Sequence, residues 1–123
     1  EMSASLVGSE MCIRDSFLLG LDDAREETLA RGTLYAEHGA DGLFVPSITA
    51  PSDITAVVDG VPLPLNVMCM PALPDFNTLT ALGVKRISMG NFLHQHWQAS
   101  SQGLFSSILN NQSFEAGFAH ADE

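Results

Sequence analysis

Basic residues, cysteines and long apolar runs are all scarce in this chain. Only 5 of its 123 residues are Lys or Arg, against 15 Asp and Glu, so the formal net charge is −10. Proteins that bind nucleic acids or anionic membranes need clustered positive charge. The scarcity of Lys and Arg therefore argues against both as partners. No apolar run approaches the roughly 18 residues of a membrane helix. We therefore expect a soluble protein. Cys12 and Cys69 have neither metal-ligand nor disulfide spacing, so we expect it in the reducing cytoplasm.

A repeated alternation of short apolar runs with helical patterns is the clearest feature that is present. Each apolar run begins after Gly or Pro, and a helical pattern separates it from the next run. Parallel strands require a crossover connection of this kind, such as a helix. The sequence therefore predicts an α/β fold with parallel strands, of the TIM type. A complete (β/α)8 barrel takes about 200 residues or more, so only half of one fits here. The predicted strands are 42–46, 64–68 and 85–89, and the predicted helices are 22–38, 51–59, 75–82 and 91–110.

The two ends of the chain differ from this pattern. Residues 1–16 have neither helical nor strand periodicity, and the stretch Ser5-Leu-Val-Gly-Ser-Glu-Met-Cys-Ile-Arg-Asp-Ser16 resembles a translated sequencing adapter. We therefore expect 1–16 to be non-native and outside the fold, the alternative being a genuine, poorly ordered arm. The domain is then expected at 17–112, followed by a loose polar tail at 113–123.

The residues at the strand ends are the candidates for a functional site, because α/β barrels carry their chemistry at the C-terminal ends of their strands. Asn66 is a carboxamide within an apolar strand and must satisfy its polar atoms. A hydrogen bond within the barrel and a contact with a substrate carboxylate both remain open for it. Ser47 lacks a Gly-x-Ser-x-Gly context, so we expect it to bind an anionic substrate or cap a loop. The predicted substrate-binding set is Pro46, Ser47, Asn66, Met89 and Gly90.

Two further patterns indicate weaker sites. Ser88-Met-Gly-Asn91 places backbone N–H groups between a strand end and a helix start, as anion cradles do, but it contains a single glycine. His94 and His96 would diverge by about 200° on a helix, since each residue turns about 100°. They are therefore not expected to form a metal pair, and the acidic residues at helix starts do not suggest a Mg²⁺ site.

Four stretches taken together resemble the isocitrate lyase/phosphoenolpyruvate mutase superfamily, in its phosphonomutase-like branch. They are Phe17-Leu-Leu-Gly-Leu-Asp-Asp-Ala, Tyr35-Ala-Glu-His-Gly-Ala-Asp-Gly-Leu-Phe-Val-Pro, Pro64-Leu-Asn-Val and Ala81-Leu-Gly-Val-Lys-Arg-Ile-Ser-Met-Gly. The resemblance implies the C-terminal half of a TIM-type barrel. It also implies a Mg²⁺-dependent parent enzyme that makes or breaks C–C or P–C bonds of small α-oxo or hydroxy carboxylates through an enolate-like intermediate.

The same resemblance implies which parts of such a site this chain carries. The family's acidic metal ligands and catalytic loop lie on earlier strands, so no catalytic or metal-binding residue is expected here, and the chain alone should be inactive. Asn66 matches the family's asparagine that faces the substrate carboxylate. At the position of Pro46-Ser47 the family's lyases tend to have a glutamate, and the phosphonomutase has a histidine. This chain has neither residue, so the resemblance implies neither the lyase nor the phosphonomutase activity specifically. The family's final helix is commonly exchanged between subunits, which implies a homo-oligomeric parent.

Two other interpretations remain open from the sequence. One is a phosphate-binding α/β-barrel enzyme of another family that uses 88–90 as its phosphate cradle. The other is a non-catalytic acidic interaction module built on a degenerate barrel. An Asp-x-Asp pair in the preceding gene sequence would favour the lyase or mutase over both.

Overall fold

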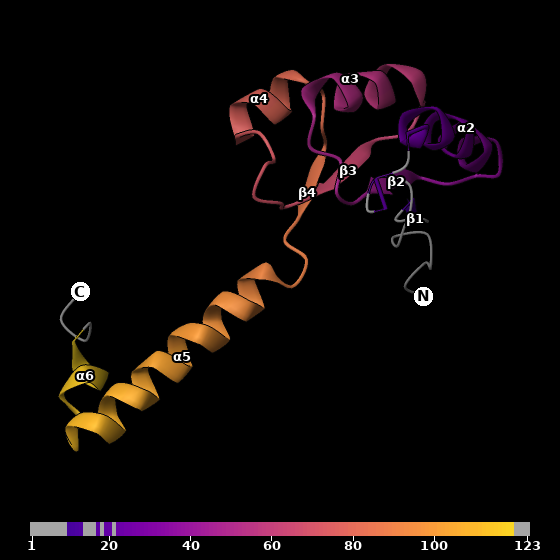
Figure 1. The fold of residues 1–123 in the computed structure, drawn as a ribbon. Coiled ribbons are helices and arrows are strands. Elements are labelled where there is room, and N and C mark those ends of the chain that lie inside the picture. The colour runs from indigo at the N-terminus through magenta and orange to yellow at the C-terminus, as the bar shows by residue number, and fades with distance from the viewer. Residues whose placement is uncertain (1–9, 14–16, 18, 21, 120–123) are drawn as a thin grey trace, which may run out of the picture. The chain divides into compact units, whose positions relative to one another are not determined.

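The structure is a computed structural model that describes residues 10–13, 17, 19–20 and 22–119. The chain divides into two compact units, Glu1–Ser88 and Met89–Glu123, and each is described by itself. In the first unit the elements are β1 (Glu10–Cys12), α2 (Ala24–Glu37), β2 (Gly42–Val45), α3 (Pro51–Gly60), β3 (Leu65–Met68), α4 (Phe76–Ala81) and β4 (Arg86–Ser88) (Figure 1). The second unit contains α5 (Phe92–Asn111) and α6 (Glu115–Phe118).

The first unit is a parallel sheet of four strands in the order β1-β2-β3-β4. Every neighbouring pair is parallel, with Leu43 beside Leu65 and Val67 beside Ile87. A helix lies in each crossover from β1 to β4, as parallel pairing requires. The predicted alternation of parallel strands and helices is therefore confirmed, with element ends within one or two residues of those expected.

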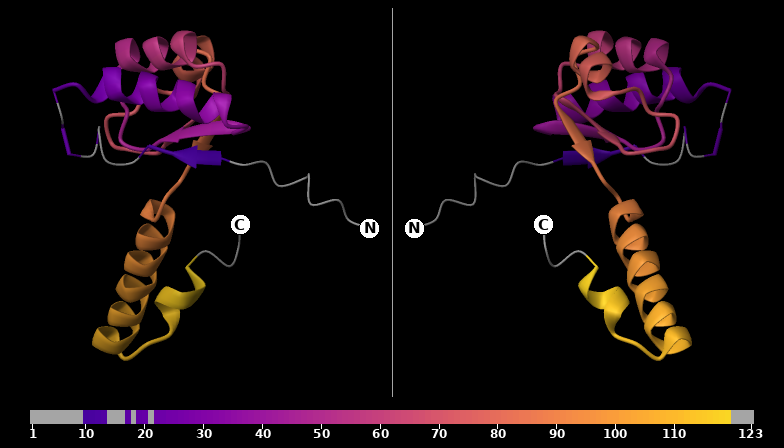
Figure 2. Two further views of the ribbon diagram at one scale, coloured as in Figure 1. Left: turned by 90° about the vertical axis from the view of Figure 1, so that its right-hand side faces the viewer. Right: turned by 90° about the vertical axis from the view of Figure 1, so that its left-hand side faces the viewer.

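The helices of the first unit cover one face of the sheet (Figures 1 and 2). Because side chains alternate between the two faces of a strand, Leu43 and Val45 point to this covered face and Phe44 to the other. The same alternation puts Asn66 on the face opposite Leu65 and Val67. The buried apolar residues are Ile13, Ala24, Leu43, Val45, Ile48, Ile54, Val57, Val61, Leu65, Val67 and Leu79.

Local signals explain where several helices begin and end. Pro51 occupies the first turn of α3, where a missing N–H costs nothing. The Asp75 carboxylate accepts a hydrogen bond from the Thr78 backbone N–H at 2.8 Å and so caps α4. Gly39 and Gly83 follow α2 and α4 with φ of +86° and +88°, a conformation that glycine adopts without strain.

The sheet contains one strand more than the sequence predicted. Glu10–Cys12 pair with β2, the Ile13 N–H donates to the Phe44 carbonyl at 2.8 Å, and Ile13 is 1% exposed. Residues 10–13 therefore take part in the fold, contrary to expectation, because an edge strand can use the backbone groups of its neighbour without a periodic pattern of its own. The rest of 1–16 lies outside the described residues, and the adapter-like origin of the segment stays a prediction.

The second unit also differs from its expected form. The tail that we expected to be loose contains the short helix α6, and its Ser113 N–H donates to the Ile108 carbonyl at 3.3 Å. Residues 120–123 lie outside the described part. Helix α5 has no buried residue. Among the described residues, no helix combines the length and the apolar character needed to cross a membrane.

Close contact between α2 and α3 depends on two glycines. A Cβ added at Gly32 would lie 2.7 Å from Cγ2 of Val61, a buried and β-branched residue that cannot swing away. A Cβ at Gly60 would meet only the Cδ2 atom at the end of the Leu29 side chain, at 2.6 Å. The two positions therefore differ in how readily the neighbour can move.

We expect Gly32→Ala to lower the free energy of unfolding of the full-length protein by about 1–3 kcal/mol through overpacking. Alanine is also a better helix former than glycine by about 1 kcal/mol, and this gain offsets part of the packing loss. The matched control, Gly60→Ala, should cost clearly less because Leu29 can change rotamer. Urea denaturation of both variants tests this, and equal effects would contradict the packing argument.

Candidate functional site

The chain that follows β2 contains an unusual serine. Ser47 has φ of +69°, in the left-handed region that a residue with a Cβ rarely adopts. Its Oγ is buried and has no hydrogen-bond partner among the described residues. Both features destabilise the folded state, and features of this kind concentrate at functional sites, where a ligand can supply the missing partner. Pro46, beside it, is buried. Both residues lie at a strand end, as the sequence predicted.

Replacing Ser47 by glycine should make the protein more stable. The change removes the left-handed strain and the unsatisfied hydroxyl together, and we expect a gain of about 1–2 kcal/mol in the free energy of unfolding. The control Ser47→Ala removes the hydroxyl but keeps the Cβ, so it should recover less of that free energy. The check is urea denaturation of the full-length protein, and a Ser47→Gly variant less stable than the wild type would contradict it.

Asn66, the second of the four residues of β3, forms the best-defined polar contact of the sheet. It is 1% exposed, its Nδ2 donates to the Ser88 Oγ at 2.8 Å, and that hydroxyl donates to the Asn66 Oδ1 at 3.1 Å. The pair joins β3 to β4 on the face of the sheet that the helices leave uncovered. The sequence left two roles open for Asn66, a hydrogen bond within the barrel and a contact with substrate. The structure contains the first, formed with a side chain from the next strand. The contact of Asn66 with a substrate carboxylate stays a prediction.

Arg86 is a neighbour that sequence reasoning missed. The register sets Phe44, Asn66 and Arg86 side by side on three successive strands, so their side chains share one face. Arg86 is exposed, and a cationic side chain on the same face as a buried amide suits a carboxylate ligand. The sequence offered one signal for Arg86. It stands two residues before Ser88, and side chains two residues apart on a strand lie on the same face.

The predicted residues Met89 and Gly90 belong to the second compact unit. Gly90 has φ of +58° in the connection from β4 to α5, and Met89 is 46% exposed. Their contribution to a site with Asn66 stays a prediction. His94 and His96 lie on α5 and are both exposed.

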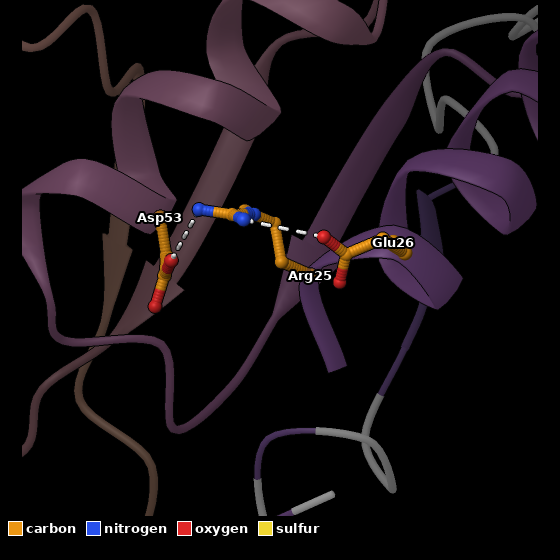
Figure 3. A network of polar contacts seen from close by, with 3 residues as sticks. All are labelled: Arg25, Glu26 and Asp53. Atoms are coloured by element: carbon orange, nitrogen blue, oxygen red, sulfur yellow. Dashed lines mark hydrogen bonds and ion pairs between the residues drawn. The ribbon is translucent and has the colours of Figure 1, made fainter. Parts of the chain in front are cut away.

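A second polar group connects the starts of α2 and α3 (Figure 3). The Arg25 guanidinium lies 3.2 Å from the Glu26 carboxylate and 3.7 Å from that of Asp53. A backbone hydrogen bond, and then Arg25, lowers the pKa of Glu26. A cavity of about 390 Å³ adjoins the group and is lined by Phe17, Gly20, Asp22, Ala24, Arg25, Glu26 and Asp53. Ion pairs this exposed contribute little stability, and the cavity is predominantly acidic, which does not suit an anionic substrate.

A metal centre requires several ligating side chains close together. No group of three or more His, Cys, Asp or Glu side chains among them is placed to hold an ion. The described residues therefore do not fit a Mg²⁺ site.

The alternation of parallel strands and helices defines part of a TIM-type α/β barrel. The sequence model of the phosphoenolpyruvate phosphomutase family matches residues 13–109, and the chain belongs to this family. The resemblance inferred from the sequence is thereby confirmed.

Solved structures show the same relationship. A proposed lyase/mutase from Burkholderia cenocepacia J2315 is 30% identical, with a TM-score of 0.76 over 90% of this chain and 40% of that one. A proposed phosphonomutase from the same organism is 35% identical, with a TM-score of 0.68 over 76% of this chain and 41% of that one. The phosphoenolpyruvate phosphomutase of Streptomyces platensis subsp. rosaceus is 27% identical, with a TM-score of 0.69 over 89% and 39%.

One curated relative, an uncharacterized protein of Mycobacterium tuberculosis (strain ATCC 25618 / H37Rv), is 32% identical over 77 residues. That match takes in 63% of this chain and 30% of the relative. The chain thus spans about 40% of the solved structures and less than a third of this relative.

Proposed function

We propose that this chain supplies the carboxylate-binding wall of a lyase or phosphonomutase-like enzyme that acts on small α-oxo or hydroxy carboxylates. The observation that carries the proposal is the buried Asn66 amide, held by Ser88 and adjacent to Arg86 on the uncovered face of the sheet. Family membership supports the enzyme class.

In this proposal the residues of the chain bind and orient the substrate. Asn66 donates an amide N–H to the substrate carboxylate, and the positive charge of Arg86 favours the anion nearby. Ser47 lines the neighbouring wall with Pro46, and its unpartnered hydroxyl hydrogen-bonds the bound substrate. Among the described residues the Ser47 hydroxyl has no hydrogen-bond partner, and the role proposed for it is binding rather than proton transfer.

Members of the family are typically magnesium-dependent, and a bound metal ion would stabilise the negative charge of an enolate-like intermediate. Because the described residues do not fit a metal site, the ligands would come from other parts of the enzyme. We assign no role in metal binding to any residue of this chain.

The second unit fits an assembly role in the same proposal. Helix α5 buries none of its residues within the chain, although it exposes Leu93, Trp97, Phe105 and Leu109. We propose a homo-oligomer that covers this helix by exchange between subunits, working in the cytoplasm without nucleic-acid or membrane partners.

The test is an assay of the full-length enzyme on phosphoenolpyruvate and on a panel of hydroxy di- and tricarboxylates. ³¹P NMR detects the formation of P–C bonds, and reduction of released α-oxo acid by a coupled dehydrogenase detects C–C cleavage. We expect turnover in one arm, abolished by EDTA and restored by excess Mg²⁺. Absence of turnover in both arms for a folded, Mg²⁺-supplied enzyme, together with tight binding of sugar phosphates, would favour the rival phosphate-binding barrel.

A further inference from the structure

We propose that Ser88 is a positioning residue that holds the amide plane of Asn66 ready for the substrate carboxylate. The inference rests on the proposed function and adds to it a residue for which neither the sequence nor the family match gave a role of this kind. Its basis is the two-way hydrogen bond between the two side chains, at 2.8 and 3.1 Å.

The hydrogen bond restricts a side chain that would otherwise rotate broadly. The terminal torsion of an asparagine has a wide, roughly two-fold energy profile, so burial alone does not fix the amide plane. Here Nδ2 and Oδ1 both contact one hydroxyl, so both ends of the amide are held by the same neighbouring side chain. A primary amide has two N–H groups, so donation of one to Ser88 sets the direction of the other.

Ser88 is suited to this task because it belongs to a rigid neighbour. It lies on β4, 22 residues from Asn66, and the two strands are joined by the parallel register that pairs Met68 with Ser88. The Ser88 carbonyl also accepts a hydrogen bond from the Cys69 N–H at 2.7 Å. Fixing the amide before the substrate arrives removes part of the ordering cost of binding, which is how preorganisation improves a site.

The hydrogen-bonding capacity of Ser88 argues against direct substrate contact. A serine hydroxyl has a single proton to donate, and the Ser88 proton is directed to the Asn66 Oδ1. Since a substrate carboxylate accepts hydrogen bonds and does not donate them, Ser88 has no proton left for it. Ser88 therefore acts through Asn66.

A double-mutant cycle on the full-length enzyme tests the inference, with the substrate turned over in the assay above. We expect Ser88→Ala to lower kcat/KM about 3- to 10-fold in the wild-type background, the range for loss of one neutral hydrogen bond. In the Asn66→Ala background the same change should alter kcat/KM by less than about 2-fold, because its target is gone. Ser88→Thr keeps the hydroxyl and should recover most of the loss.

A spectroscopic measurement adds a readout that activity cannot provide. In ¹⁵N-labelled full-length enzyme, Ser88→Ala should accelerate hydrogen exchange of the Asn66 Nδ2 protons, whereas Ser88→Thr should not. If Asn66→Ala itself leaves kcat/KM unchanged, the proposed carboxylate site is wrong and the positioning role falls with it. If Asn66→Ala is impaired but Ser88→Ala has its full effect in that background, only the positioning role is overturned.

Discussion

Replacing Asn66 by alanine is expected to lower kcat/KM of the full-length enzyme about 10- to 100-fold. The change removes a hydrogen bond to a charged group, worth about 1.5–3 kcal/mol, from a residue that is 1% exposed. Each 1.36 kcal/mol corresponds to about a tenfold change in rate, which gives the stated range. Steady-state kinetics on the substrate identified in the assay measure the effect.

Two controls separate this effect from a loss of folding. Ser47→Ala should reduce kcat/KM less, since Ser47 lines the wall through a hydroxyl that contributes a weaker, neutral contact. Asn66→Asp keeps the shape but sets a negative charge against the substrate carboxylate, so it should be impaired at least as strongly as Asn66→Ala. Thermal melts of all three variants establish that they are folded. Full activity of a folded Asn66→Ala enzyme would limit this residue to a structural role.

The 123-residue chain studied alone is expected to self-associate. Helix α5 has no buried residue, and Leu93, Trp97 and Leu104 are 61%, 71% and 38% exposed on one helical stripe. Exposed apolar side chains of this kind favour association, as do the outer edges of β1 and β4, the two end strands of the sheet that the described residues form. Light scattering of the purified chain should give a mass well above the 13.2 kDa of one copy.

A matched pair of variants attributes the association to its cause. The triple change Leu93→Gln, Trp97→Gln and Leu104→Gln removes the apolar stripe without altering charge and should shift the distribution strongly towards smaller species. Ala99→Gln with Ser106→Gln makes similar changes on the opposite side of α5 and should leave the mass unchanged. A compact wild-type monomer with a sharp cooperative melt would contradict the prediction.

Local sequence signals account for the elements that were predicted correctly. Strand β2 begins after the glycine-rich turn at Gly39, and its apolar run is what a buried parallel strand requires. Pro51 and Asp75 begin α3 and α4 through first-turn and capping preferences that depend on a few neighbouring residues. The strand at Glu10–Cys12 was missed for a related reason: three residues carry too little pattern, and their pairing depends on the edge of β2.

The composition of the site was predictable only in part. Asn66 was identifiable because a polar group in an apolar strand is costly unless it has a partner, a rule that concerns single residues. The identity of that partner was not, because Ser88 lies 22 residues away and meets Asn66 only through the sheet register. Arg86 was missed for the same reason.

The amino-acid sequence by itself determined the order of strands and helices, the acidic surface and the position of polar residues at the strand ends. These follow from short-range preferences and from the alternation of side chains along a strand. Only the tertiary structure decided that Ser47 adopts a left-handed conformation with a buried, unpartnered hydroxyl, and that Asn66 is held by Ser88. Both depend on the packing of segments distant in the chain, which imposes a backbone angle or a contact that no local preference favours.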